Sequence, residues 1–105
     1  NTPEADIINI SVKKDFQAKV TKWNTRANHN RLVFGEWSFG TGSKFVNNMP
    51  LLYEFAQAQM NVINQAEGGY TFWSWKTFDD AGAFYGWSLR NVLRDSRLRA
   101  IFNSK

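Results

Sequence analysis

Two aromatic stretches decide the expected fold of this chain: residues 32–38 read LVFGEWS, and residues 69–77 read GYTFWSWKT. The first begins with a short apolar run that lacks polar alternation, which is typical of a strand buried on both faces of a parallel sheet. The second is rich in aromatic and β-branched residues, which favour strands. We therefore predict two strands, near residues 31–36 and 69–75.

Helical periodicity surrounds both predicted strands. An amphipathic helix is expected from the N-cap candidate Ser11 to about Asn28. A second helix is expected to begin at Pro50 and to stop before Gly68. A third, basic helix is expected to start near Ser88 and to close the chain. Strands that alternate with helices imply parallel pairing through right-handed crossovers.

This order predicts an α/β fold class, as the C-terminal portion of a (β/α)8 TIM barrel. About two β/α units and a preceding helix would form a single segment over residues 1–105. A whole barrel needs about 250 residues, and two parallel strands are too few for a stable sheet. The chain also begins with Asn1 rather than Met. We therefore expect a processed or excised segment that is incomplete on its own.

Composition excludes several classes of function. The chain has no cysteine and only one histidine, His29, so thiol chemistry and a redundant metal site or Ser-His-Asp triad are excluded. We expect no cofactor and no metal. No apolar run approaches the roughly 20 residues that a membrane-spanning helix needs.

The formal net charge of +4 raises the alternative of a nucleic-acid partner. Much of the positive charge lies near the C-terminus, in Arg90, Arg94, Arg97, Arg99 and Lys105. These residues fall at helical spacing opposite an apolar stripe, which is typical of the solvated face of an amphipathic helix. We therefore expect no nucleic-acid partner; such a partner would bind with an affinity that falls steeply with salt.

The candidate for chemistry is Glu36, which directly follows the first predicted strand. In a (β/α) barrel, catalytic groups project from the C-terminal ends of strands. Trp73 and Trp75 share one face of the second predicted strand, because side chains alternate with period two. Parallel pairing would place them level with Glu36. A carboxylate beside indole rings is a plausible subsite for a sugar.

These residues carry a resemblance to a known family. Residues 33–38 resemble the VGEWS element on strand seven of family-5 glycoside hydrolases of the exo-β-1,3-glucanase type. Residues 69–77 are similar to their strand-eight GWxFWxWKTE, and residues 87–90 resemble the WxxQ segment that follows. The match covers most of residues 31–93. It implies a retaining hydrolase of the cell wall or extracellular space that acts on β-glucan oligo- or polysaccharides.

The resemblance also implies roles for single residues. Glu36 matches the nucleophile that forms a covalent glycosyl-enzyme intermediate. Trp73 matches the aromatic platform under the sugar, and the peptide bond between Trp73 and Ser74 matches one that is often cis. We expect Trp37 and Trp75 to help shape the pocket, which makes Trp73, Trp37 and Trp75 the substrate-binding set.

Two departures from the family pattern matter. Lys76 and Thr77 match the family but are followed by Phe78 instead of Glu. Retaining glycosidases need two carboxylates about 5 Å apart, and no segment matches the one that supplies the acid/base. We interpret Asp79 and Asp80 as turn residues.

Two main alternatives therefore stay open. The chain is part of a retaining hydrolase that needs the remainder of the barrel or a complementary chain, or it is a non-catalytic, truncated hydrolase relative. In the second case it would act as a glucan binder, a decoy or an assembly partner.

Overall fold

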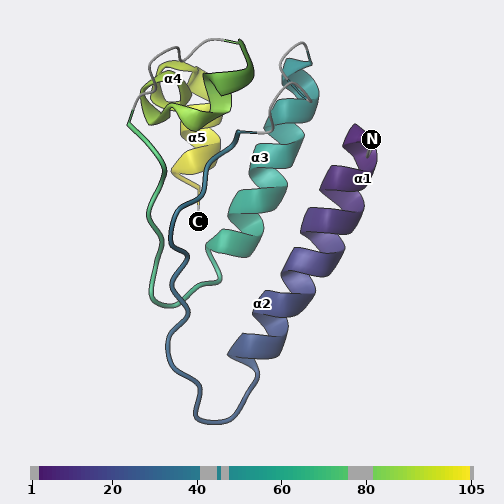
Figure 1. Cartoon of the computed structure of the whole chain (residues 1–105), viewed down its shortest axis with the longest axis vertical. Helices are drawn as coiled ribbons and strands as arrows, with labels where there is room; N and C mark the ends of the chain where they lie inside the picture. The colour runs from purple at the N-terminus through teal and green to yellow at the C-terminus, as the bar shows by residue number, and fades with distance from the viewer. Residues whose placement is uncertain (1–2, 41–44, 46–47, 76–81, 105) are drawn as a thin grey trace.

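Helices and extended segments follow one another along the chain in the predicted order (Figure 1). The computed structural model describes residues 3–40, 45, 48–75 and 82–104. Its helices are α1 (Glu4–Asp6), the π-helical η1 (Ile7–Phe16), α2 (Gln17–Asn24), α3 (Met49–Ile63), the 3₁₀-helical η2 (Gly82–Trp87), α4 (Leu89–Arg94) and α5 (Ser96–Phe102).

The first three elements form one long helical rod, so the predicted helix start at Ser11 is wrong. The rod begins after Pro3, whose φ of −57° suits a helix start. Ile8 and Val12, one turn apart, are both buried. The apolar face therefore continues on the N-terminal side of Ser11, and the burial of Ile8 favours helix there over a cap at Ser11.

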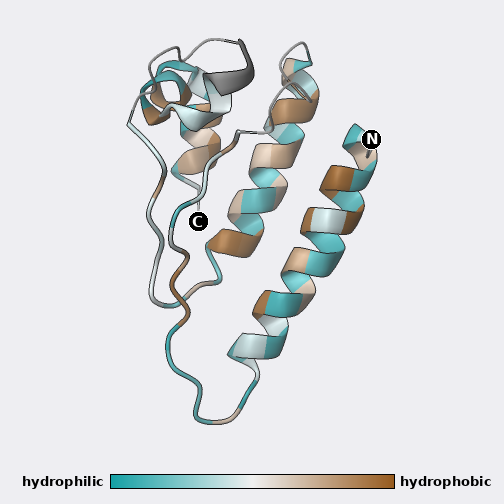
Figure 2. Cartoon of the chain, viewed as in Figure 1, coloured by the Kyte–Doolittle hydropathy of each residue, from teal (hydrophilic) through white to brown (hydrophobic). Residues whose placement is uncertain are grey.

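The helix predicted to begin at Pro50 and to stop before Gly68 is confirmed as α3, which ends at Ile63. Asn48 caps it: its side chain accepts a hydrogen bond from the backbone N–H of Leu51 at 3.3 Å. α3 lies between η1 on one side and α5 on the other. Figure 2 shows hydrophobic and hydrophilic positions alternating along the long helices, as expected for helices with one buried face.

The hydrophobic core centres on α3. It combines the buried side of that helix with residues from the first rod, from α4 and α5, and from the segment after Glu36. Its most deeply buried large side chains are Phe39, Phe45, Ile8, Met60, Ile63, Leu98, Val20, Val62 and Val92.

The single C-terminal helix that the sequence predicts is two helices, broken at Asp95. The predicted start near Ser88 is confirmed: Ser88 caps α4 by accepting a hydrogen bond from the N–H of Asn91. The backbone at Asp95 is extended, with φ −82° and ψ 116°. Its carboxylate accepts hydrogen bonds from the backbone N–H groups of Arg97 and Leu98, so the same residue ends α4 and caps α5.

The predicted portion of a (β/α)8 barrel is wrong: the described residues form a small helical globule without a sheet. The segments expected as strands run parallel, but only Phe34 and Tyr70 form a bridge. The N–H of Thr71 donates to the carbonyl of Phe34 at 3.1 Å. A regular ladder would then join Trp73 to Glu36, yet the N–H of Trp73 donates to the carbonyl of Trp37 at 2.8 Å. This shift of one residue ends the ladder.

The extended segments are covered on one face only, so the prediction of strands buried on both faces is also wrong. Leu32, Phe34, Tyr70 and Phe72 pack against the helical core. Val33, which lies between two of them, is 57% exposed. The helices cover Leu32 and Phe34 in the first segment and Tyr70 and Phe72 in the second, and leave the odd-numbered neighbours of these residues open. The alternation ends at Glu36, which is exposed, and Trp37, which packs against the core. Among the helices in the described part of the chain, none has both the length and the apolar character of a membrane span.

Candidate functional site

Glu36 lies at the edge of an open hollow of about 360 Å³. The hollow lies where residues 36–40 pass the end of the second extended segment. Its lining comes from both extended segments, from α3 and from η2: Glu36, Trp37, Ser38, Gly40, Gln59, Trp73 and Trp87. A volume of this order suits a small-molecule ligand.

Backbone hydrogen bonds join the three chain segments around the hollow. The N–H of Trp73 donates to the carbonyl of Trp37, and the N–H of Ser74 donates to the carbonyl of Trp87 at 2.9 Å. The N–H of Phe39 donates to the carbonyl of Gly86 at 3.0 Å. The first segment therefore contacts both the second segment and η2, which fixes the relative positions of the residues that line the hollow.

Glu36 is exposed, and no second acid occurs in the described lining of the hollow. Its neighbours on the chain are held on either side. Thr71 donates a side-chain hydrogen bond to the carbonyl of Gly35 at 2.8 Å, and the carbonyl of Trp37 accepts from Trp73. The segment that carries Glu36 is thus positioned by the segment that carries Trp73.

Trp73 and Trp87 contribute partly exposed indole rings to the hollow. Trp73 is 53% exposed and Trp87 is 37% exposed. Gly40 lies directly against the indole of Trp87, and a Cβ at that position would overlap the ring. The close approach therefore requires glycine at position 40. The peptide bond between Trp73 and Ser74 is cis, as the family resemblance implied.

Trp37 lines the hollow and also belongs to the aromatic core. Its ring centroid lies 5.0 Å from that of Phe72 and 5.2 Å from that of Tyr70, in edge-to-face arrangements. Its Nε1 is buried and has no hydrogen-bond partner among the described residues. Trp37 therefore supports the hollow from the core side.

Trp75 does not line the hollow, although the sequence groups it with Trp73. Its side chain is 58% exposed, while its backbone carbonyl accepts a hydrogen bond from the N–H of Arg90 at 2.9 Å. The structure thus brings together Glu36, Trp73 and Trp37, and places Trp75 outside that group. The stretch that holds Lys76, Thr77, Phe78, Asp79 and Asp80 lies outside the described residues.

Sequence reasoning did not name four of the residues that line the hollow as site residues: Ser38, Gly40, Gln59 and Trp87. Trp87 had a signal, because it belongs to the motif resemblance after the second segment. Gln59 had none: it lies in the middle of α3, where polar residues are ordinary. Its Nε2 donates to the carbonyl of Ser38 at 3.2 Å and so ties α3 to the segment that carries Glu36.

No metal-binding cluster was found in the part of the chain that the structure describes. His29, the single histidine, lies in the loop after α2, with its Nε2 3.7 Å from a carboxylate oxygen of Glu67. No protein-family model matches the chain, and neither the curated proteins nor the solved structures include a significant match to it.

Proposed function

We propose that this chain carries the nucleophile side of a retaining β-glucan hydrolase of the exo-β-1,3-glucanase type. Glu36 is the nucleophile and Trp73 is the sugar platform. The observation that carries the proposal is that an exposed carboxylate shares one hollow with the indole rings of Trp73 and Trp87. A carboxylate nucleophile beside the anomeric carbon is the arrangement that retaining glycosidases use.

The proposed roles follow from the chemistry of each group. The exposed indole of Trp73 offers a flat apolar surface to the C–H face of a pyranose unit. Glu36 attacks the anomeric carbon and forms a glycosyl ester, while the glycosidic oxygen leaves with a proton from a general acid. Water then cleaves the ester, which returns the carboxylate and releases the sugar. Trp87 and Trp37 form the walls that hold the unit in place.

Glu36 is the only acidic residue in the described lining of the hollow, so the described lining does not supply a general acid. Retaining enzymes place a second carboxylate about 5 Å from the nucleophile. General acid–base catalysis typically contributes about 10²–10⁴-fold to the rate. We therefore propose two partners, a β-glucan in the extracellular space or cell wall and a complementary chain that supplies the acid. Alone, the chain is expected to hydrolyse unactivated glucan negligibly.

The lone carboxylate also favours a second candidate function, a non-catalytic glucan binder. In that case the indole rings hold the sugar, and Glu36 only accepts hydrogen bonds from hydroxyl groups. The two functions differ in one measurable property, which is whether Glu36 reacts covalently with a sugar.

Covalent labelling tests this difference directly. The probe is a 2-fluoro glucoside with a dinitrophenyl leaving group, which departs without a general acid. We expect a sugar adduct on Glu36 in the peptide mass spectrum of the folded wild-type chain. Glu36→Gln should abolish the adduct, and Trp73→Ala should slow labelling because the sugar loses its platform.

Glu54→Gln is the matched control. Glu54 is an exposed carboxylate on α3 that lies 3.9 Å from the Nζ of Lys13 and does not line the hollow. This variant should be labelled at the wild-type rate. If the folded wild-type chain forms no adduct, Glu36 is not a nucleophile, and the non-catalytic glucan binder is the remaining candidate function. An adduct spread over several exposed carboxylates would rule out a formed site.

A further inference from the structure

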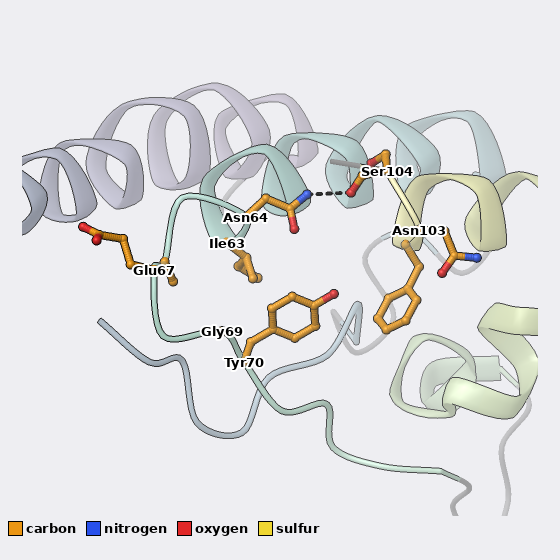
Figure 3. A pocket seen from close by; sticks show the side chains of 9 residues that line it. Ile63, Asn64, Glu67, Gly69, Tyr70, Asn103 and Ser104 are labelled. Carbon is orange, nitrogen blue, oxygen red and sulfur yellow. Dashed lines mark hydrogen bonds between the residues drawn. The ribbon is translucent and has the colours of Figure 1, made fainter. Parts of the chain in front are cut away.

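A second pocket, of about 450 Å³, lies at the opposite end of the second extended segment from Trp73. It forms where the C-terminal end of α3, the turn at Gly69 and the end of α5 meet (Figure 3). None of its lining residues also lines the hollow at Glu36. Its volume falls in the range of small-molecule sites, which is about 300–1,000 Å³.

Two aromatic rings form a corner in this pocket. The ring centroids of Tyr70 and Phe102 lie 6.2 Å apart, and the ring planes meet at 80°. Ile63, which is 1% exposed, adds a buried aliphatic wall. A ligand with a flat apolar face can therefore pack against one ring and place its edge against the other.

Hydrogen-bonding groups that the described residues leave wholly or partly unpaired surround the corner. Figure 3 shows the hydroxyl of Tyr70 directed toward the end of α5, where Asn103 lies. No described residue forms a hydrogen bond with that hydroxyl. Asn64 donates its Nδ2 to the carbonyl of Ser104 at 2.7 Å, which leaves its Oδ1 as an acceptor. The pocket thus offers a hydroxyl, an amide oxygen and the exposed amide of Asn103.

The charges of the lining argue against an ionic ligand. No lysine, arginine or histidine is among the described lining residues, so none of these residues offers an anion a counter-charge. Glu67 is the one acidic lining residue, and its carboxylate extends away from Tyr70 in Figure 3. That carboxylate lies 3.7 Å from the Nε2 of His29, outside the pocket. The one carboxylate of the described lining is therefore not directed at the aromatic corner (Figure 3).

We propose that this pocket binds a neutral, hydroxyl-rich ligand of the size of a pyranose sugar, as a second carbohydrate site remote from Glu36. The aromatic corner takes the apolar C–H face, and Tyr70, Asn64 and Asn103 bind the hydroxyl groups. The inference does not rest on the nucleophile role of Glu36, because the two lining sets are separate.

Titration of the ¹⁵N-labelled chain by NMR tests the proposal, with methyl β-D-glucopyranoside and laminaritriose as probes. We expect saturable shifts, in the millimolar range, of the backbone amides of Asn64, Tyr70 and Asn103. Tyr70→Phe keeps the ring and removes only the hydroxyl. It should weaken binding by about 3–10-fold, since a hydrogen bond contributes about 0.5–1.5 kcal/mol. Asn64→Asp, which replaces the amide with a charge, should weaken it at least as much.

Trp73→Ala, in the other hollow, is the control and should leave these shifts unchanged. Sugar-induced shifts confined to the hollow at Glu36, or no saturable shift at all, would overturn the proposal. Unchanged affinity in folded Tyr70→Phe and Asn64→Asp variants would also overturn it. If glucoside labelling of Glu36 fails while the Tyr70 pocket still titrates, only the nucleophile role is lost; the reverse result removes only the second site.

Discussion

The two faces of the paired extended segments come from the same stretches of sequence but have opposite surroundings. The inner face, formed by Leu32, Phe34, Tyr70 and Phe72, packs against the helices. On the outer face, Val33, Trp73 and Trp75 are 57%, 53% and 58% exposed. Large aromatic residues occur on both faces, so aromatic content alone does not separate core from binding surface. For the residues named here, the position in the two-residue alternation separates core residues from surface residues.

The two faces should therefore respond differently to truncation. Removal of an inner ring opens a cavity among neighbouring rings and costs stability. Removal of an outer ring takes away a surface that is already in contact with water and leaves the core intact. The outer face matters for ligand binding, whereas the inner face matters for folding.

The largest expected effect is that of Phe72→Ala. Phe72 contacts three other rings of the core, with ring-centroid distances of 5.0 Å to Trp37, 5.9 Å to Phe39 and 5.8 Å to Phe102. We expect the free energy of unfolding to fall by about 3 kcal/mol, the lower part of the range for Phe→Ala because Phe72 is only partly buried. Urea unfolding followed by circular dichroism measures the change.

Trp73→Ala, one residue along the chain, is the matched comparison. It removes a larger side chain from the outer face, and we expect a change of no more than about 0.5 kcal/mol in the free energy of unfolding. Equal losses of stability in the two variants would break the distinction between the faces.

A smaller loss of stability is expected from Gly40→Ala, which tests the contact between Gly40 and the indole of Trp87 in η2. The new Cβ would overlap the indole of Trp87 and force that ring to move. Overpacking of this kind costs about 1–3 kcal/mol. The fluorescence of Trp87 should change as well, because its ring leaves its present contact.

Gly35→Ala is the control for this substitution. A Cβ at Gly35 would meet no atom within 4 Å, so its effect on stability should be within about 0.5 kcal/mol. If Gly40→Ala is as well tolerated as Gly35→Ala, the indole of Trp87 does not pack against position 40 in solution.

Local sequence patterns predicted much of the helical part and part of the site. Pro50, followed by a regular apolar stripe, was enough to place α3, because a long periodic helix is defined by its own residues. Glu36 and Trp73 were expected together from parallel pairing, and they do line one hollow. These predictions needed only local periodicity and one assumption about neighbouring segments.

The remaining features depend on contacts between distant residues. The apolar run from Leu32 to Phe34 does not reveal that Val33 stays exposed, because that depends on how many layers cover the segment. Gly40 and Trp87 lie far apart in the sequence, so their contact leaves no local pattern. The loss of the predicted sheet follows from the one-residue shift at Glu36 and Trp37, which periodicity also does not encode.

Among the substitutions expected to destabilise the chain, the smallest effect is expected at the junction of α4 and α5, which is held by polar contacts. Asp95 caps α5 and also accepts a hydrogen bond from the hydroxyl of Tyr53 on α3 at 2.9 Å. Loss of an N-cap costs about 1 kcal/mol, and we expect that loss in Asp95→Ala. Asp95→Asn should cost less, because asparagine also caps helices well. Thermal unfolding at neutral pH measures both.

The same junction gives a pH dependence with a definite sign. Burial, followed by the hydrogen bond and the negative charge of Asp95, raises the pKa of Tyr53 above its ordinary 10.0. Burial and the charge of Asp95 also raise the pKa of Tyr85. The folded state therefore favours the protonated phenols, so their contribution to stability is complete below pH 10 and is lost as the pH rises through the raised values. The free energy of unfolding should fall more steeply above pH 10 in the wild type than in Tyr53→Phe. Equal slopes would show that the folded state does not raise the pKa of Tyr53 through burial and Asp95 together.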